Sequence, residues 1–201
     1  MAPDKTKKNA KPARGRPRDP ATRKKILAAA ARLLNEGGIS AVTMDAVAQS
    51  AGVGKPTIYR QWPNAQSVAM AAFLETAKPP SRSTAKGTAV EALRTQLRAI
   101  ATAFASRTGR NTAMMIAAAQ NDSELAKVFR NQFIMGRRED GRALLARAIA
   151  DGELRADIDL DATLDLIYAP LYFRLLIGHG PLDAAFTDTV LDLALTGLTP
   201  R

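Results

Sequence analysis

The sequence of 201 residues contains no cysteine and a single histidine. The missing cysteines exclude disulfides and thiolate metal sites, and they fit a reducing compartment, so we expect a cytoplasmic protein. The histidine, His179, lies in a Gly-His-Gly-Pro segment that is typical of a surface turn. We find no Ser/His/Asp or Cys/His set, and no GxxxxGK[ST] phosphate-binding loop. We therefore expect neither an enzyme nor a bound cofactor or metal.

Long apolar runs and strand patterns are also missing. No apolar run reaches the ~18–20 residues that a membrane-spanning helix needs. The charged N-terminus has no apolar segment of the kind found in secretory signals. No stretch alternates apolar and polar residues as a half-buried strand does, and alanine and leucine dominate over valine, isoleucine and tyrosine. We therefore expect an all-α protein without a membrane partner.

Acidic residues are scarce in the first third of the chain. Residues 1–66 carry thirteen Lys and Arg against four Asp and Glu, whereas residues 67–201 carry sixteen against fifteen. Nearly all of the net charge of +10 therefore lies in the first part. A basic field confined to one region indicates a polyanionic partner, because a generally basic protein would have spread the charge along the chain.

The N-terminal tail, residues 1–18, combines Lys, Arg, Pro, Ala and Gly without apolar periodicity, so we expect it to be disordered when free. Within it, Arg14-Gly15-Arg16-Pro17 resembles the core of an AT-hook, which lays arginines in a narrow minor groove. A phosphate-binding arm without sequence preference is the alternative, and the short match favours that alternative. In either case we expect Arg14, Arg16 and Arg18 to contact DNA.

Residues 43–62, TMDAVAQSAGVGKPTIYRQW, contain two short amphipathic segments on either side of a turn, about the length of a helix-turn-helix. Thr43 can cap the first segment, and Gly52 can take the positive φ that a sharp exit from it needs. In the second segment Ile58 and Trp62 can face inward. The outward side chains are donors and cations with one aromatic ring, and these can meet phosphates and base edges: Lys55, Thr57, Tyr59, Arg60 and Gln61.

Two ordinary surface helices would give the same pattern, and the localised basic charge favours the DNA-binding interpretation. Asp19-Pro20 is a good helix start, and Gly37-Gly38 ends the helix that follows it. Helices at about 20–36, 43–51 and 55–62 would make a three-helix head over residues 19–64. Asn64 can cap a fourth helix, from 65 to about 77.

After a loop at residues 78–86, the pattern is helical almost throughout. We expect helices at about 88–107, 111–120, 123–151, 161–177 and 183–197, which brings the total to about nine. The last two are the most apolar, so they are the candidates for a two-fold dimer interface. Pro170 lies inside the first of these two, where it removes a backbone hydrogen bond and predicts a kink.

The order of a basic tail, a capped helix ending in Gly-Gly, the motif of residues 43–62 and a helical remainder resembles the TetR family of transcriptional regulators. The resemblance is specific over residues 16–75 and extends to length and helical layout beyond them. It implies an all-α homodimer with a DNA-binding head and a C-terminal domain, residues 65–201, for dimerisation and ligand binding. It also implies a repressor that a small, largely apolar effector releases from a palindromic operator. The alternative is an architectural DNA-binding protein without an effector.

The resemblance assigns roles to particular residues of the head. Residues 55–62 would form the recognition helix, with Lys55, Pro56 and Thr57 at the end that meets bases and phosphates. Tyr59 would touch the DNA backbone, with Gln61 as a further contact, and Thr43 would meet a phosphate. Family members often carry Lys-Glu after the third helix, where this chain has Ala65-Gln66 after Asn64. We therefore expect one phosphate contact to be missing, and the basic tail to compensate for it.

The resemblance also implies an effector cavity among the helices from 65 to 177, although the sequence does not identify the effector. Deformable methionines and aromatic rings suit an apolar ligand, while each of them can equally be ordinary core. Gln120 or Asn121 could orient a ligand. The candidate lining residues are Met70, Phe73, Phe104, Met114, Met115, Phe129, Phe133, Tyr168 and Tyr172.

Overall fold

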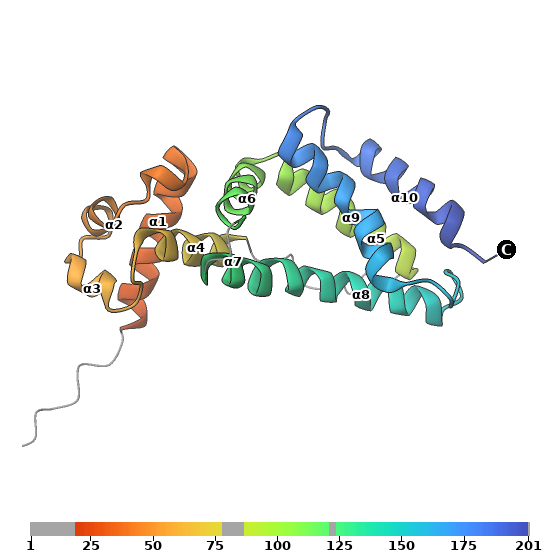
Figure 1. Ribbon diagram of the computed structural model, residues 1–201, viewed down its shortest axis with the longest axis horizontal. Coiled ribbons are helices and arrows are strands. Elements are labelled where there is room, and N and C mark those ends of the chain that lie inside the picture. Colours follow the sequence, from red (N-terminus) through yellow and green to blue (C-terminus); the bar gives the residue numbers. More distant parts are fainter. Residues whose placement is uncertain (1–18, 78–86, 121–123, 201) are drawn as a thin grey trace, which may run out of the picture.

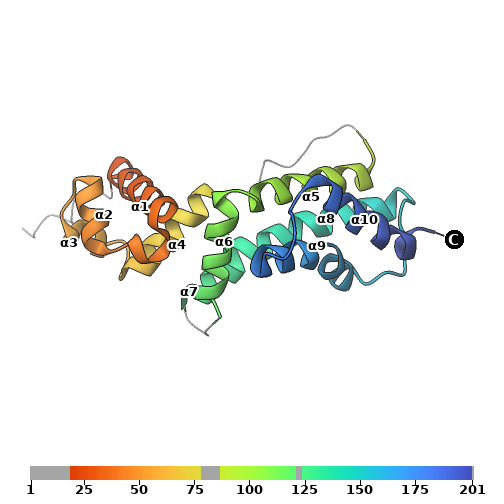
Figure 2. The ribbon, with the colours of Figure 1, turned by 90° about the horizontal axis from the view of Figure 1, so that it is seen from above.

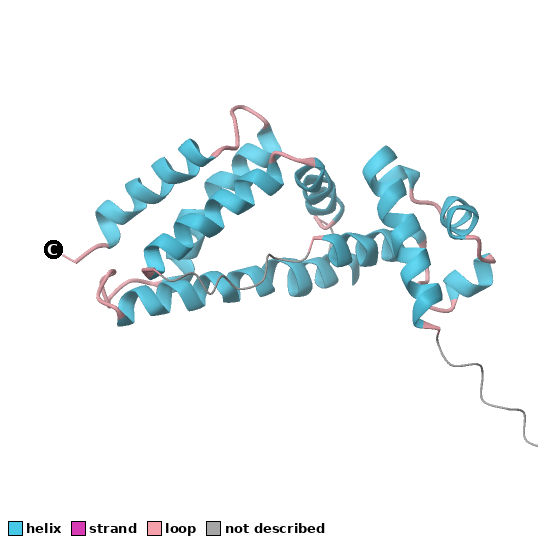
Figure 3. Cartoon of the chain, turned by 180° about the vertical axis from the view of Figure 1, so that it is seen from behind, coloured by secondary structure: helices cyan, strands magenta, loops and turns pink. Residues whose placement is uncertain are grey.

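The computed structural model describes residues 19–77, 87–120 and 124–200, and all regular structure in these ranges is helical (Figure 3). The expected all-α class is therefore confirmed. Because α7, η1 and α8 follow one another without a gap, the described residues form nine helical segments. The elements are α1 (Pro20–Ala41), α2 (Met44–Ala51), α3 (Lys55–Tyr59), α4 (Ala65–Thr76), α5 (Ala89–Phe104), α6 (Arg107–Ala118), α7 (Glu124–Phe129), the π-helix η1 (Arg130–Ile134), α8 (Met135–Ala150), α9 (Leu160–Ile177) and α10 (Ala184–Leu198).

Side-chain caps fix where most of these helices begin. Asp19 accepts a hydrogen bond from the Ala21 amide at 3.0 Å, and Asn64 accepts one from the Ser67 amide at 2.8 Å. Each cap satisfies an amide that has no partner within its helix. At the other end of α1, Gly38 leaves the helical region with φ +71°, and one further turn follows it.

Several boundaries differ from those expected. The first helix was expected to end at about residue 36 and the third at 62, but α1 continues to Ala41 and α3 ends at Tyr59. The fifth and sixth helices were expected at about 88–107 and 111–120, but α5 ends at Phe104 and α6 begins at Arg107. The reason is Ser106, whose hydroxyl caps α6 by accepting a hydrogen bond from the Thr108 amide at 3.1 Å. The polar residues after it gave no apolar periodicity from which a helix start could be predicted. The α9 helix continues through Pro170 without interruption, and the kink stays a prediction.

The helices enclose two hydrophobic cores along an elongated molecule (Figures 1 and 2). The first core joins α1, α2 and α3 to α4, α6, α7 and η1, with Phe73 and Phe133 packed at a centroid distance of 5.0 Å. The second core lies among α5, α8, α9 and α10, at the other end of the molecule. The head predicted over residues 19–64 therefore shares its core with four elements that follow it, and the domain boundary at residue 65 stays a prediction.

Within the described ranges, no helix combines the length and apolarity that would be needed to cross a membrane. The same ranges contain no group of three or more histidine, cysteine, aspartate or glutamate residues placed to hold a metal ion.

Candidate DNA interface and effector cavity

The α2–α3 unit has helix-turn-helix geometry. The Thr43 hydroxyl caps α2 by accepting a hydrogen bond from the Ala46 amide at 3.1 Å. Gly52 ends α2 in the left-handed conformation, with φ +65°, and a residue with a side chain would be strained there. The chain then turns within two residues into α3, where Pro56 occupies the first turn. The expected cap and the expected turn are both present.

Packing beneath α3 determines which of its side chains reach the surface. Ile58 is fully buried and Trp62 is 6% exposed, in the first core. The guanidinium of Arg23 on α1 covers the Trp62 ring at 4.9 Å. Because these two side chains anchor α3 and the turn after it in the first core, Tyr59 faces outward and is 53% exposed. The division into two core residues and an outward tyrosine matches the sequence interpretation.

The other candidate DNA contacts of the head surround Tyr59 on the outer side of the motif. Thr43, Lys55, Pro56 and Arg60 are exposed, while Thr57 and Gln61 are half-buried. Arg60 and Gln61 lie in the turn after α3, which ends at Tyr59. Arg60 donates a hydrogen bond to the Thr57 hydroxyl at 3.3 Å.

The structure adds Asp45, which sequence reasoning missed, to the same surface. Its carboxylate pairs with the ammonium of Lys55, and this hydrogen bond raises the pKa of Lys55. The acid stands ten residues before the lysine, so no helical spacing connects the two. Both side chains are exposed, and such pairs contribute little to stability. The pair instead places one negative charge among the candidate DNA contacts.

The expected DNA interface also included the N-terminal tail and the residues just after the helix-turn-helix. Arg14, Arg16 and Arg18 lie outside the described residues. Ala65 opens α4 after its Asn64 cap, and Gln66 beside it is exposed, so neither residue supplies a cation at the end of the motif.

An apolar cavity of about 560 Å³ lies between α6, the α7–η1–α8 segment and α9. Its size is that of a site for a small organic molecule. The π-helix in its wall widens the helical turn at this point, and such π-bulges are frequent at functional sites. The lining residues are Ile116, Ala119, Gln120, Phe129, Arg130, Ile134, Arg137, Arg138, Leu164, Asp165, Tyr168, Ala169, Tyr172 and Leu176.

Three of the nine candidate lining residues, Phe129, Tyr168 and Tyr172, contribute to this cavity, and so does Gln120. Asn121 lies outside the described residues. The other six pack elsewhere, because aromatic rings and methionines at helical spacing have the same pattern whether they fill a core or line a cavity. Met70, Phe73, Met115 and Phe133 are buried in the first core, Met114 packs against that core, and Phe104 lines a smaller hollow of about 290 Å³.

The polar side chains in the cavity wall differ in their hydrogen-bond and ion-pair partners. The Tyr168 hydroxyl donates to the Gln96 side chain, and burial raises the pKa of Tyr168. Arg138 pairs with Asp161 at 3.0 Å and with Asp165. Among the residues that the structure describes, Arg137 has no such carboxylate: its guanidinium lies 3.6 Å from the centroid of the Phe133 ring, and burial lowers its pKa. These arginines were not predicted, because the run from Arg137 to Asp140 is typical of a solvated helix face.

The α6 helix connects this cavity to the head. Near its start, the Asn111 side chain is 6% exposed and donates a hydrogen bond to the Asn35 side chain of α1 at 2.6 Å. One turn later, Met114 packs against Gly38, where a Cβ atom would lie 3.0 Å from the methionine sulfur. At its other end, Ile116 lines the cavity. A displacement of α6 by a ligand would therefore act directly on α1.

A second apolar surface lies on α9 and α10; it adjoins the cavity, which its Leu176 also lines, and it has no cover among the described residues. Its large side chains are 49% to 68% exposed: Leu166, Phe173, Leu176, Ile177 and Leu193.

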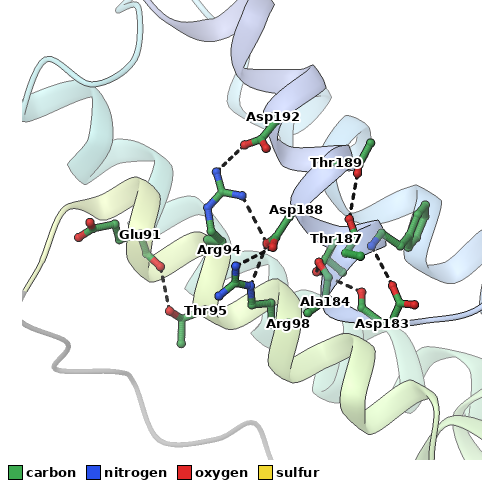
Figure 4. Close-up of polar contacts among 12 residues, drawn as sticks. Glu91, Arg94, Thr95, Arg98, Asp183, Ala184, Thr187, Asp188, Thr189 and Asp192 are labelled. Carbon is green, nitrogen blue, oxygen red and sulfur yellow. Dashed lines mark hydrogen bonds and ion pairs between the residues drawn. The ribbon is translucent and has the colours of Figure 1, made fainter.

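An ion-pair network holds α10 against α5, as Figure 4 shows. Arg98 contacts Asp188 at 2.6 Å, and Arg94 contacts Asp192 at 2.5 Å.

A helix-turn-helix with an outward face of donors, joined by one helix to an apolar cavity, defines the class of helix-turn-helix transcriptional regulators. Comparison with known families agrees with this class. Residues 26–71 match the family described as "Bacterial regulatory proteins, tetR family", and residues 84–194 match "Tetracyclin repressor-like, C-terminal domain". The chain belongs to the TetR family of transcriptional regulators, which is not a family of enzymes.

Individual relatives cover most of the chain. The HTH-type transcriptional regulator YdeS of Bacillus subtilis (strain 168) is 41% identical over 89% of this chain and 91% of its own length. The solved TetR family transcription regulator SCO0332 is 31% identical, with a TM-score of 0.70 over 89% of this chain and 99% of its own. FadR from Bacillus subtilis, solved in complex with stearoyl-CoA, shares the fold with a TM-score of 0.67 at 20% identity, over 87% of this chain and 98% of its own.

Proposed function

We propose that the protein is a sequence-specific repressor that binds a near-palindromic operator as a homodimer and leaves it when a small, largely apolar effector binds. The observation that carries the DNA-binding part is the outward face of α3, fixed by the burial of Ile58 and Trp62 beneath it. A short helix held in this way can enter the major groove and present its first turn to base edges.

The individual contacts follow from chemistry and exposure. Lys55 and Arg60 carry charges for phosphates or guanine edges, and Thr57 and Gln61 carry neutral donors and acceptors. Pro56 is exposed and apolar, which suits a thymine methyl group. Arg14, Arg16 and Arg18 would add phosphate contacts from the tail and supply the charge that Ala65 lacks. A protein that makes these contacts would act in the cytoplasm, where the DNA is.

We propose that the dimer forms through the exposed apolar surface of α9 and α10. Side chains such as Phe173 and Leu193 are 59% and 68% exposed, and a second copy of the chain would bury them. A two-fold axis through this surface would set the recognition helices about 34–36 Å apart, which matches successive major grooves on one face of DNA.

The effector would bind in the cavity between α6, α7–η1–α8 and α9. The complex of FadR with stearoyl-CoA supports this proposal, because it is a case of the same fold holding a ligand with a long apolar chain. Release from DNA would follow from a shift of α6, which contacts α1 through Asn111 and Met114. A coupling of about 1–3 kcal/mol between the two sites would be typical.

The test compares operator binding by wild type and by the double variant Tyr59→Phe, Thr57→Ala, using fragments selected from the source genome and fluorescence anisotropy. We expect the double variant to lose operator binding while its dimer stays folded, and Gln66→Ala, an exposed change just outside the motif, to bind normally. Unaltered binding by the double variant would contradict the assignment of α3. Deletion of residues 1–18 should reduce the dependence of affinity on salt, since fewer counterions are released.

The alternative is an architectural DNA-binding protein without an effector, and its specific support is the concentration of basic residues in the tail. The same titration separates the two functions. A repressor should prefer its operator over random DNA by about 10³-fold or more, whereas an architectural protein should bind both almost equally.

A further inference from the structure

Arg137 carries a positive charge in the wall of the effector cavity, and no carboxylate among the described residues forms an ion pair with it. Its guanidinium donates to two backbone carbonyls, that of Phe133 at 3.0 Å and that of Ala77. Both acceptors are neutral, and the ring of Phe133 lies beneath the guanidinium. Asp140, three residues further on, acts on Arg137 only from beyond ion-pair distance. Arg137 is half-buried, and a charge withdrawn from water in this way normally has a partner of opposite sign, so the missing anion calls for an explanation.

Arg138, the neighbouring residue, shows what a neutralised arginine looks like in the same wall. It lines the cavity as Arg137 does, but its guanidinium contacts the carboxylates of Asp161 and Asp165 on α9. Two consecutive arginines of one helix therefore differ in their partners. The ion pairs of Arg138 join α8 to α9, whereas the charge of Arg137 has no carboxylate partner among the described residues.

Tyr172 supplies a second donor beside Arg137. Its hydroxyl has no hydrogen-bond partner among the residues that the structure describes, although Tyr168, one turn earlier on α9, is bonded to Gln96. The Tyr172 ring packs edge-on against the Phe104 ring, with the two centroids 5.1 Å apart. Arg137 and Tyr172 both line the cavity, and burial raises the pKa of Tyr172 while the charge of Arg137 lowers it. The phenol stays protonated at neutral pH and can donate.

From the apolar cavity, the unpaired guanidinium of Arg137 and the free hydroxyl of Tyr172, we infer that the effector is a small carboxylic acid with an apolar body. The inference rests on the proposed function, since it names the chemistry of the ligand at that same site. The body would pack against side chains such as Ile116, Ile134 and Leu164. The carboxylate would accept a charge-assisted hydrogen bond from Arg137 and a second bond from Tyr172, and it would neutralise the half-buried charge of Arg137.

Matched pairs of acid and amide test the inference, because the two members of a pair differ in charge but hardly in shape. The probes are octanoate with octanamide and 4-phenylbutanoate with 4-phenylbutanamide, titrated into the full chain by calorimetry. A hydrogen bond to a charged group corresponds to about a tenfold or greater change in affinity, so each acid should bind at least about tenfold more tightly than its amide. Equal affinity, or tighter binding of the amides, would overturn the inference.

Variants locate the preference on the protein. Arg137→Met should lose about tenfold or more in affinity for the acids and keep its affinity for the amides, while Arg137→Lys should keep most of the preference. Tyr172→Phe should lose a smaller factor. Arg142→Met removes the same charge from the same helix outside the cavity and should leave the acids unaffected. An undiminished preference in both Arg137→Met and Tyr172→Phe, each with a cooperative thermal transition, would also overturn the inference.

A third probe, octanoyl-CoA, separates a free acid from a thioester, whose acyl carbonyl is uncharged. Tighter binding of octanoyl-CoA than of octanoate would contradict a carboxylate at Arg137. Operator release, measured with the same probes, keeps the two proposals apart. If the amides bind and release the protein from DNA as well as the acids do, the repressor function is supported and the carboxylate inference is wrong. If the acids bind through Arg137 without releasing the protein from DNA, the carboxylate inference is supported and the repressor function is wrong.

Discussion

The arginines of the C-terminal helices differ in what compensates their charge. Arg94, Arg98 and Arg138 contact aspartates on neighbouring helices, at or near the surface. Arg137 contacts carbonyls and an aromatic ring, inside a cavity wall. The residue type alone carries none of this information, because the outcome depends on which helix packs opposite. The role of an individual residue therefore depends on what packs against it, as Gly109 in the bundle and Asp45 in the head also show.

Gly109 is required by a close approach of two backbones. A Cβ atom at this position would overlap the carbonyl oxygen of Phe104 at the end of α5. We expect Gly109→Ala to lower the free energy of unfolding by about 1–3 kcal/mol, because the α5–α6 junction would have to shift. Gly136→Ala is the matched control: a Cβ there meets nothing within 4 Å, and the change should stabilise α8 by about 0.5–1 kcal/mol. Urea denaturation measures both, and equal effects of the two changes would contradict the account of Gly109.

Asp45 opposes DNA binding if the α3 surface faces the phosphates. Asp45→Asn removes one negative charge from that surface and releases Lys55 from its ion pair. We expect operator affinity to rise about two- to fivefold at low salt, and the gain to shrink at high salt as charges are screened. Glu124→Gln, an exposed charge change outside the head, is the control and should have no effect. Weaker operator binding by Asp45→Asn would mean that the pair is needed to position Lys55.

Whole helices carry the connections between the two sites. The α6 helix contacts α1 through Asn111 and reaches the cavity at Ile116. The α9 helix lines the cavity with Tyr168 and Tyr172 and exposes Phe173 on the adjacent face. A ligand between these helices would therefore touch both the route to the DNA-binding head and the helix proposed for the dimer interface.

The attachment of α10 to α5 should depend on pH. The hydrogen bonds of Asp188 with Arg98 and Arg94 lower the pKa of its carboxyl group below the unfolded value of about 3.9. The stabilisation is therefore complete above that value and is lost as the pH falls through the folded pKa. We expect Asp188→Asn to lower the Tm at pH 7, with a difference from wild type that shrinks towards pH 3. A difference that stays the same at both pH values would show that the network does not act through ionisation.

The sequence predicts elements of this protein better than it predicts the cavity. The head could be predicted because caps such as Thr43 and Asn64, the turn at Gly52 and the localised charge all act over a few neighbouring residues. The cavity depends on which faces of α6, α8 and α9 meet, and the sequence of no single segment predicts that arrangement. Phe133 and Phe129 lie four residues apart on one helical segment, yet only Phe129 lines the cavity. Arg137 gave no signal, since an arginine is usual on a solvated helix face.

In the whole molecule, the proposed DNA-binding face and the proposed dimer interface lie far apart. The head lies at one end of the elongated chain and the apolar surface of α9 and α10 lies on the bundle towards the other (Figure 1). Joining two copies through that surface would produce a pair of heads in a fixed geometry, and that geometry is what an effector could change. Stable dimers bury about 800 Å² on each partner, so the proposed interface must involve most of both helices.

A charge on this apolar surface should separate the protomers. Phe173 is 59% exposed on α9, and Phe173→Asp would place a carboxylate in the proposed apolar interface. We expect this variant to be a folded monomer in light scattering and to bind the operator at least about tenfold more weakly, since each half-site would be held alone. Met135→Asp changes a large side chain of similar exposure on α8, outside the proposed interface, and should leave the dimer intact. A dimeric Phe173→Asp variant would place the interface elsewhere.

The most direct test of the account is a titration of the full chain against a fragment selected from the source genome and against a scrambled fragment of the same length and composition. We predict saturation at two protomers per near-palindromic site, with a preference of about 10³-fold or more for the selected fragment. Binding of both fragments with similar affinity, and without a defined stoichiometry, would contradict it.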